Sequence, residues 1–475
     1  MSINIRSKFL QEYSYAIEHN AAAVFAGAGM SSESGYVSWK SLLRTFANDI
    51  RLDVDKETDL ISLAQYYKNE MGGRNSLNQE LINQFTKQSR KNRYLNALAK
   101  LPIKSYWTTN YDTVIEDTLR NNFSLNVDVK ITQESLALIK KDSNVTVYKF
   151  HGGVSMPEKA VLTKDDYELF TYSHRLFITA LQGELVSKTF LYIGYSFNDP
   201  NLEAILSQIR ILIGENQLNH YCIIRKIQKK DYNSEQDYIY DLAKQELKAH
   251  DLVRYGIHTI FIDNYDEIID ILSQLYVTYI TRRIFIAGSC RNYGKWEKSN
   301  AYSFLYRLGY TLIKKDYIIS SGFVEGVGPQ VVNGALTAIN ELHLNVEKYL
   351  QIKPLPLIDG KADYIESTTK KMFQQDMISQ AGIIIFLFGN QYYDGQLCNS
   401  KGVWEDFERA IKANKYIIPV GVTGFTALQI QNILEERADQ YNYLKPFWDS
   451  LRNETNPEKL VHLIVSIVDS INHFI

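Results

Sequence analysis

Short apolar runs alternate with stretches of helical periodicity along most of the chain. In the first half, apolar residues recur at spacings of three and four over 202–213 and again over 266–279, which predicts amphipathic helices. Between such stretches lie short runs rich in β-branched and aromatic residues, typical of buried strands, at 103–110, 145–152, 188–196, 220–226 and 257–263. This alternation favours the α/β class, in which helices cover a mostly parallel sheet.

The second half repeats the scheme. Its predicted elements are strands at 284–288 and 317–321, a helix at 296–314, a strand-like segment at 348–356, a helix ending near Gln380, a buried strand at 382–390, a helix at 401–415, a strand at 416–424 and a terminal helix at 456–475. Each half opens on an apolar strand that runs into small residues, AAAVFAGAGMSS at 21–32 and RRIFIAGSC at 282–290. We therefore predict two Rossmann-like domains in tandem, 1–281 and 282–475, with the boundary near Thr281.

Composition excludes several classes of protein. At roughly 100–200 residues per domain, 475 residues allow two or three domains. The balance of 52 basic against 54 acidic residues lacks the basic surface expected of a nucleic-acid-binding protein. No apolar run approaches the ~20 residues of a membrane span, and the first 20 residues lack the apolar block of a signal peptide. We expect a cytoplasmic protein that binds neither nucleic acid nor membrane.

The turn FAGAGMSS lies where the first strand gives way to a helix. Gly27 and Gly29 allow the backbone to turn tightly and to approach a ligand closely. The N–H groups that follow, with Ser31 or Ser32, suit an anion at a helix N-terminus. A turn of this kind also occurs where nothing binds, and the third glycine of the dehydrogenase motif GxGxxG is absent.

Polar side chains follow two later strands of the first half. Asn110 and Asp112 come directly after the strand in WTTNYD, and His151 ends the strand in KFHGG. Ligands of α/β sheets bind at the carboxyl ends of strands, so these three residues are candidates for a site. Asp112 could equally cap the helix that follows, and a lone histidine is more often structural than catalytic.

Small residues also stand at strand ends in the second half. Gly322, Gly326 and Gly328 precede a helix that begins near Pro329, a residue favoured in the first turn of helices. The arrangement suits a phosphate, although such glycines can also let a loop pass over a helix. We find no base–nucleophile pair and no metal cluster here, which indicates ligand binding rather than catalysis.

Taken together, the motifs of the first half resemble the sirtuin family. GAGMS, NYD after a strand, a strand-terminal His-Gly and GYSFNDPN at 194–201 occur in that family's order, and VLTKDDYELF at 161–170 resembles its bacterial branch. The resemblance implies that NAD⁺ binds as a substrate, with Asn110 near the nicotinamide ribose and His151 as general base on a ribose hydroxyl. It also implies that Gly194, Ser196 and Asp199 border the adenosine half. The implied NAD-binding residues are Ala26, Gly27, Ala28, Gly29, Ser31, Asp112, Gly194, Ser196 and Asp199.

One departure from the sirtuin pattern decides the reaction. Deacetylating sirtuins carry a four-cysteine zinc module that helps to form the acyl-lysine groove, whereas only Cys222 lies in this domain. Without that module, water is the expected acceptor. We predict an NAD⁺ hydrolase that releases nicotinamide and ADP-ribose and needs no metal and no cofactor. A sensor that binds NAD without cleaving it, or a protein deacylase, remains the alternative.

The second half resembles the SLOG family of nucleotide-binding domains. The resemblance implies a ligand pocket formed by Gly288, Ser289, Gly322, Gly326, Gly328, Gly389, Asn390, Gln391 and Asp406. The family's basic contacts match Gln374 and Gln391 here, its acidic contact matches Asp406, and Arg291, Lys370 and Lys371 lie close by in the sequence.

The order of the two domains resembles the effectors of the bacterial Thoeris anti-phage system. This implies a homotetramer or higher assembly that is activated by a cyclic ADP-ribose isomer. A partner protein with a TIR domain makes that isomer, and the activated effector then consumes cellular NAD in antiviral defence by abortive infection.

Overall fold

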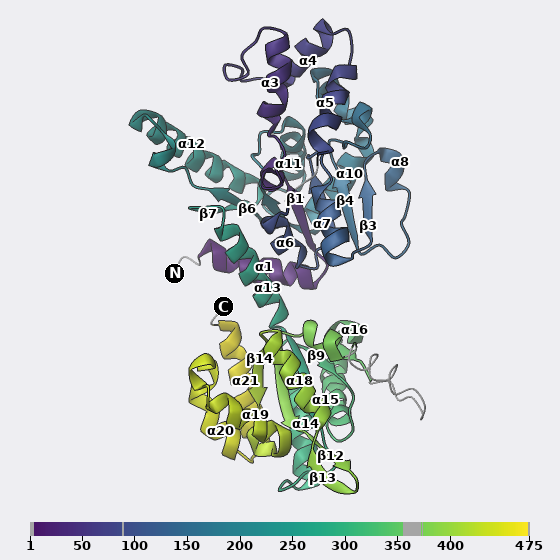
Figure 1. Cartoon of the computed structure of the whole chain (residues 1–475), viewed down its shortest axis with the longest axis vertical. Coiled ribbons are helices and arrows are strands. Elements are labelled where there is room, and N and C mark those ends of the chain that lie inside the picture. Colours follow the sequence, from purple (N-terminus) through teal and green to yellow (C-terminus); the bar gives the residue numbers. More distant parts are fainter. Residues whose placement is uncertain (1–3, 88–89, 355–371, 373, 474–475) are drawn as a thin grey trace. The chain divides into compact units, whose positions relative to one another are not determined.

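The chain folds into two compact α/β units. The computed structural model describes residues 4–87, 90–354, 372 and 374–473. One unit is Met1–Tyr276 and the other is Val277–Ile475, so the division falls within helix α13 (Glu267–Ile280), whereas the sequence placed the boundary near Thr281. The figures show the elements of each unit (Figure 1).

The first unit is built on a seven-stranded sheet in which every neighbouring pair is parallel. In spatial order its strands are β3 (Val127–Lys130), β4 (Val145–Lys149), β2 (Ser105–Thr108), β1 (Ala22–Ala26), β5 (Thr189–Ile193), β6 (His220–Arg225) and β7 (Ile257–Ile262). All residues of β1 and β2 are buried, as expected for strands with helices on both faces of the sheet. Strands β2 to β4 lie on one side of β1 in the sheet, and strands β5 to β7 lie on the other side. The topological switch point is therefore between β1 and β5.

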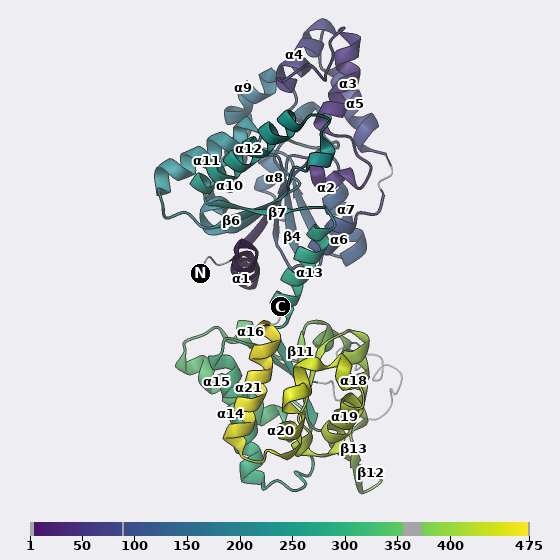
Figure 2. The same cartoon turned by 90° about the vertical axis from the view of Figure 1, so that its left-hand side faces the viewer.

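Helices cover both faces of this sheet. They are α1 (Ile5–Glu18), α2 (Ala28–Ser32), α3 (Trp39–Asp49), α4 (Leu60–Glu70), α5 (Asn75–Phe85), α6 (Arg93–Ala99), α7 (Val114–Phe123), α8 (Gln133–Leu136), α9 (Lys164–Ser173), α10 (Arg175–Ser187), α11 (Pro200–Ile213), α12 (Glu235–Leu252) and α13. Figure 2 shows α10, α11 and α12 on one side of the sheet and α6 and α7 on the other. Helices α3 to α5 form a separate layer with a core of its own, into which Tyr111 and Leu162 also pack.

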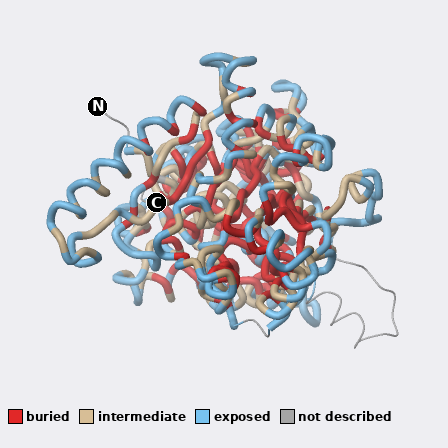
Figure 3. Tube along the Cα trace, turned by 90° about the horizontal axis from the view of Figure 1, so that it is seen from above, coloured by how far each residue is buried: buried red, intermediate tan, exposed pale blue. Residues whose placement is uncertain are grey.

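The second unit has a five-stranded parallel sheet. Its strands, in spatial order, are β10 (Leu350–Ile352), β9 (Ile318–Ser321), β8 (Arg283–Ser289), β11 (Ile383–Phe388) and β14 (Tyr416–Pro419). The central strand β11 is entirely buried. Figure 3 shows the buried stretches of the chain toward the inside of the trace and the exposed ones around it. An antiparallel hairpin, β12 (Asn390–Tyr393) and β13 (Gln396–Asn399), follows β11.

The helices of the second unit include α14 (Lys298–Lys314), α15 (Gly328–Glu341), α16 (Val346–Tyr349), α18 (Lys401–Lys412), α19 (Phe425–Glu435), α20 (Trp448–Asn453) and α21 (Pro457–His473). Residues 374–379 are also helical, in agreement with the helix predicted to end near Gln380. Figure 2 shows α14, α15 and α21 on one side of β11 and α18 and α19 on the other. Short 3₁₀ turns complete both units: η1 (Pro157–Lys159), η2 (Lys229–Asp231), η3 (Val253–Tyr255), η4 (Gly421–Thr423), η5 (Ala438–Gln440) and η6 (Asn442–Phe447).

The two parallel α/β sheets confirm the predicted fold class. The sequence reading did not include β3 or the β12–β13 hairpin, and several predicted strands extend too far, because strand pairing ends where the polar site residues begin. Among the described helices, none combines the length and the apolar character needed to cross a bilayer.

Candidate functional site

Four neighbouring strands of the first sheet end at one place. Strands β4, β2, β1 and β5 lie side by side and parallel, so their carboxyl ends share an edge of the sheet. The segments that follow them contain His151, Asn110, the glycine turn and Gly194, respectively. Because this edge is the topological switch point of the sheet, it is the expected place for a ligand.

The glycine turn after β1 lies directly on the end of β5. The N–H of Gly27 donates to the carbonyl of Ile193 at 2.9 Å, and the N–H of Gly29 donates to the carbonyl of Gly194 at the same distance. A Cβ on Gly27 would lie only 2.4 Å from the oxygen of Gly194. Both glycines are therefore required by the contact between the two strand ends. The N–H groups of Gly27 and Gly29 are used in this contact, whereas the anion site predicted from the sequence involves the N–H groups that follow them and stays a prediction.

Asn110 is held under this turn. Its Nδ2 donates to the carbonyl of Gly27 at 3.0 Å and to Ser31 Oγ at 2.9 Å, and its backbone N–H donates to Thr108 Oγ1. The side chain is buried, and its Oδ1 accepts no hydrogen bond from the described residues. The amide oxygen is thus the part of Asn110 that remains available to a ligand.

Asp112 serves the local backbone as well as the cavity. Its Oδ1 accepts from the N–H of Val114, the first residue of α7, at 3.0 Å, although the N-cap position itself is taken by Thr113. Beneath it, the ammonium group of Lys149 donates to the carbonyl of Asp112 and lies 3.5 Å from Glu116 Oε1. Burial raises the pKa of Glu116, and the charge of Lys149 offsets only part of that rise. The sequence reading did not identify this buried pair, which supports the loop that contains Asn110.

His151 faces a carboxylate. Its Nε2 lies 3.0 Å from Asp199 Oδ2, and both side chains are almost completely buried. Burial alone would raise the pKa of Asp199, but the facing imidazole and two backbone N–H groups at the start of α11 lower it below its ordinary value. The sequence resemblance assigned Asp199 to the adenosine half, whereas the structure places its carboxylate against His151.

These residues line one cavity of about 540 Å³. Of the predicted residues, those that line it are Ala28, Gly29, Ser31, Asn110, Asp112, His151, Gly194, Ser196 and Asp199. Ala26 and Gly27 lie beneath the cavity and do not line it, because Ala26 ends the buried strand β1 and Gly27 packs on Gly194. Residues that the sequence reading did not include, among them Trp39, Phe85 and Tyr167, complete the wall.

A second cavity of about 530 Å³ adjoins the first. The two share Gly29, Gly194, Tyr195 and Ser196, and the second extends past the ends of β6 and β7 to Arg225 and Tyr265. Ligand pockets are typically about 300–1,000 Å³. The two volumes together suit an elongated ligand with two ends, joined across the glycine turn.

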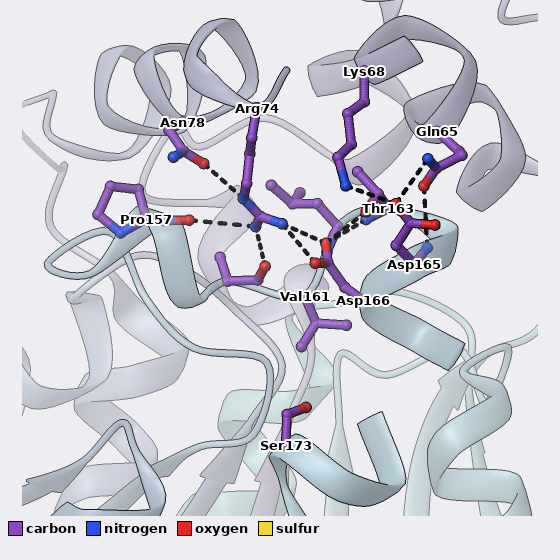
Figure 4. A network of polar contacts seen from close by, with 12 residues as sticks. Gln65, Lys68, Arg74, Asn78, Pro157, Val161, Thr163, Asp165, Asp166 and Ser173 are labelled. Atoms are coloured by element: carbon purple, nitrogen blue, oxygen red, sulfur yellow. Dashed lines mark hydrogen bonds and ion pairs between the residues drawn. The ribbon is translucent and has the colours of Figure 1, made fainter. Parts of the chain in front are cut away.

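A polar network fixes the wall formed by the helical layer (Figure 4). Arg74, which immediately precedes α5, donates to both oxygens of Asp166 and to the carbonyl of Ala160. Asp166 also accepts from the N–H groups of Leu162 and Thr163. Because the N–H of Val161 donates to the carbonyl of His151, this network connects the helical layer to the segment beside the histidine.

The second unit has a cavity of about 220 Å³ at the carboxyl ends of its strands. The predicted ligand residues that line it are Gly288, Ser289, Gly322, Asn390, Gln391 and Asp406. Gly326, Gly328 and Gly389 do not line it. These glycines instead allow parts of the chain to approach closely. A Cβ on Gly326 would overlap the Cys290 carbonyl oxygen, and a Cβ on Gly328 would lie 2.5 Å from Phe323 Cα. A Cβ on Gly389 would lie 2.6 Å from Thr426 Cβ. Gly326 and Gly328 thus allow close contacts between neighbouring loops.

The charged and amide groups of this cavity interact with one another. Gln374 Nε2 donates to Asp406 Oδ1 at 2.8 Å, and Arg291 pairs with Glu325. Gln391 and Arg291 both line the cavity, whereas Lys370 and Lys371 fall outside the described residues. Across the parts of the chain that the structure describes, no group of three or more His, Cys, Asp or Glu side chains is arranged to hold a metal ion.

Comparisons with known proteins place both units in families. Residues 104–249 match the SIR2-like domain family, and residues 267–471 match the Sir2- and TIR-associating SLOG family. The chain is 40% identical to the NAD(+) hydrolase ThsA of Bacillus cereus (strain MSX-D12) over 476 residues, with 98% of each chain covered. It is 39% identical to the NAD(+) hydrolase ThsA of Enterococcus faecium, over 97% of this chain and 98% of that protein. A ThsA of Acinetobacter baumannii (strain 532279) is 39% identical over 90% of this chain and 89% of its own length.

Proposed function

The chain belongs to the ThsA family of NAD(+) hydrolases, and from this premise we propose that its first unit cleaves NAD⁺ to nicotinamide and ADP-ribose under the control of a nucleotide ligand bound by its second unit. The observation that carries the proposal is the meeting of Asn110 and His151 at one 540 Å³ cavity, on the ends of adjacent strands.

The chemistry of the reaction suits these side chains. The bond between ribose C1′ and the nicotinamide nitrogen breaks, and its electron pair leaves with nicotinamide. Positive charge develops on the ribose, where the Oδ1 of Asn110 can stabilise it. A water oxygen then bonds to C1′, and its proton passes through the ribose hydroxyls to the imidazole of His151, the kind of side chain that most often serves as a general base. No metal or cofactor enters this balance.

The adjoining cavities suit the two ends of a dinucleotide. The nicotinamide ribose would lie in the cavity with Asn110 and His151, and the adenosine would extend past Ser196 toward Arg225 and Tyr265. The pyrophosphate would cross the turn at Gly29, which lines both cavities. The zinc module of the deacetylating sirtuins has no counterpart in a unit whose single cysteine, Cys222, is buried in β6.

We further propose that a cyclic ADP-ribose isomer binds the 220 Å³ cavity of the second unit and activates the first. The small residues at Gly288, Ser289 and Gly322 leave room for phosphates, and the Gln374–Asp406 pair offers acceptors for ribose hydroxyls. A TIR-domain partner would supply the ligand. The active protein, a homotetramer or larger assembly in the cytoplasm, would then deplete NAD as antiviral defence.

The catalytic assignment is tested with His151→Ala and Asn110→Ala. Loss of a general base typically lowers a rate by about 10²–10⁴-fold, so we expect nicotinamide release by either variant to fall by about that factor. Nicotinamide and ADP-ribose are measured by chromatography after the purified protein is incubated with NAD⁺ and a panel of cyclic ADP-ribose isomers.

His250→Ala is the matched control, because this histidine lies exposed on α12 and lines neither cavity. The control should keep the wild-type rate. Wild-type turnover by His151→Ala or by Asn110→Ala would refute the assignment. A protein that binds NAD⁺ without consuming it under any of these conditions would be a sensor rather than a hydrolase.

A further inference from the structure

A buried carboxylate, that of Asp199, and a buried imidazole, that of His151, face each other at the catalytic cavity. Asp199 Oδ2 and His151 Nε2 lie 3.0 Å apart, and their side chains are only 9% and 5% exposed. The two atoms are in ion-pair contact but are not aligned as a hydrogen bond, and neither makes an aligned hydrogen bond with any other described residue. Tyr195 also faces this carboxylate, but the imidazole is the one group near Oδ2 in the described structure that can carry an opposite charge.

The carboxylate of Asp199 is held in place from two sides. Its other oxygen, Oδ1, accepts from the N–H of Asn201 at 2.9 Å and so caps the start of α11. The loop just before it is pinned by Lys248 of α12, whose ammonium group donates to the carbonyl of Ser196 at 2.8 Å and to Asn198 Oδ1 at 2.6 Å. Asp199 therefore meets the histidine from a rigid position.

The imidazole is fixed as firmly. The ring of Phe150 is stacked 5.5 Å from it, and the rings of Tyr167 and Phe170 stand edge-on at 5.7 Å. The second ring nitrogen, Nδ1, makes no hydrogen bond to any described residue, while His151 itself lines the 540 Å³ cavity. Nδ1 is thus the ring nitrogen that is left for a ligand.

The ionisation of Asp199 determines the tautomer. The pKa of Asp199 lies below its ordinary value: burial would raise it, but the facing imidazole and the backbone donors of α11 outweigh burial. An ionised carboxylate can only accept hydrogen bonds. The nitrogen that faces it must then bear a proton, and in a neutral imidazole the other nitrogen must bear the lone pair.

We propose that Asp199 is the positioning residue of the hydrolase site: it fixes the proton of His151 on Nε2 and leaves the lone pair of Nδ1 directed at the substrate as the base. This inference rests on the proposed function, because the base acts in NAD⁺ hydrolysis. It assigns Asp199 a role in turnover instead of a role in binding the adenosine half. The same division of labour between a buried carboxylate and an imidazole operates in hydrolases with a Ser-His-Asp triad.

Two substitutions remove the carboxylate and keep the helix cap. Asn and Ser are both good N-cap residues, so Asp199→Asn and Asp199→Ser should leave α11 and the melting temperature unchanged. Ser is too short to reach the ring, and the amide of Asn can donate to Nε2 and move the proton to Nδ1. We expect kcat to fall by about 10²–10⁴-fold in both variants while KM for NAD⁺ stays within about 2-fold.

The matched control is Glu203→Gln. Glu203 is the next carboxylate on α11, lies exposed in its first turn and does not line the catalytic cavity. This variant should keep the wild-type kcat and KM. If the Asp199 variants raise KM and leave kcat intact, Asp199 binds substrate and does not position the base. Wild-type kinetics in both variants would also overturn the proposal.

A measurement that needs no turnover separates this inference from the proposed function. The tautomer of His151 is read at about pH 8 from the ¹⁵N shifts of histidine-labelled protein, with His151→Ala to assign the signal. We expect the proton on Nε2 in the wild type and a mixed or Nδ1 tautomer in Asp199→Asn. A wild-type ring protonated on Nδ1 would refute the inference. If the wild type cleaves no NAD⁺, the proposed function fails while the tautomer still decides the role of Asp199.

Discussion

Two ion pairs connect the layer of helices α3 to α5 with the start of α9: Lys68 pairs with Asp165, and Arg74 pairs with Asp166. The Arg74–Asp166 pair is the more buried of the two. Arg74 is 17% exposed and Asp166 is 22% exposed, and the carboxylate also accepts from Thr163 Oγ1. Burial would raise the pKa of Asp166, but the hydrogen bonds and charge of Arg74 and the backbone donors lower it below its ordinary value. The pair therefore stabilises the first unit only while Asp166 is ionised.

The consequence is a loss of stability in acid. A carboxyl group whose pKa is lower in the folded than in the unfolded protein stabilises the fold fully at pH values above its unfolded-state pKa of about 3.9. That stabilisation is lost as the pH falls through the folded-state pKa. Asp166→Asn should lower the free energy of unfolding at pH 7 by about 2 kcal/mol and should flatten its decline below pH 4. Urea titrations at several pH values measure both effects.

Asp165→Asn is the neighbouring control. Asp165 pairs with Lys68 at 2.7 Å but is 48% exposed, so its loss should cost much less. Equal losses for the two variants would show that burial does not distinguish the pairs.

At the scale of single residues, the sequence predicted which polar residues follow the strands better than it predicted the residues that pair with them. Asn110 and His151 stood out because each directly follows an apolar strand. Asp199 as the partner of His151, and Lys149 as the partner of Glu116, could not be predicted, since each pair joins separate elements that only the packing of the sheet brings together.

Among the elements, the turn from β1 into α2 depends on a close contact with the end of β5. The turn packs on the end of β5, where a Cβ at Gly27 would lie 2.4 Å from the Gly194 oxygen and 2.7 Å from Tyr195 Cα. Backbone atoms cannot move aside as a flexible side chain can. The β1–α2 turn and the end of β5 must therefore shift together if residue 27 acquires a side chain.

Gly27→Ala should thus destabilise the first unit by about 1–3 kcal/mol and lower its affinity for NAD⁺. Gly183→Ala is the control, because Gly183 lies within α10 with no atom within 4 Å of its added Cβ. Alanine there should stabilise the helix by up to about 1 kcal/mol. Thermal unfolding and NAD⁺ titration calorimetry measure both variants, and a fully stable, NAD⁺-binding Gly27→Ala would contradict the packing argument.

The elements were predictable where hydrophobic patterning was strong. Strand β11 and helix α18 follow from their apolar residues alone, whereas β3 is a four-residue strand with only two buried positions. The β12–β13 hairpin had a signal that was not used: Asp394 and Gly395 at its turn have φ values of 49° and 75°, which suit a two-residue Asp-Gly turn.

At the scale of the whole molecule, each unit has a cavity at the carboxyl ends of its parallel strands, and among the described residues an imidazole–carboxylate pair lies only at the first of these cavities. We propose that the cavity of the second unit controls the first. The ligand must then bind the active arrangement more tightly than the resting one, by ~1.4 kcal/mol for each tenfold shift of the equilibrium.

The second cavity can be filled at one position without disturbing the sheet. A Cβ on Gly322 meets nothing closer than 3.5 Å and the residue lines the cavity, so Gly322→Leu should occupy the ligand's space. Gly288 is unsuitable, because a Cβ there would lie 2.4 Å from the Leu387 oxygen in the neighbouring strand.

The most direct test follows nicotinamide release by the full chain before and after a cyclic ADP-ribose isomer is added, with Gly322→Leu in parallel. We predict slow release by the wild type that accelerates at least tenfold with one isomer, and a Gly322→Leu variant that stays slow and shows no binding of that isomer by calorimetry. An equal rate with and without every isomer, or undiminished activation of Gly322→Leu, would contradict control of the hydrolase by the second unit.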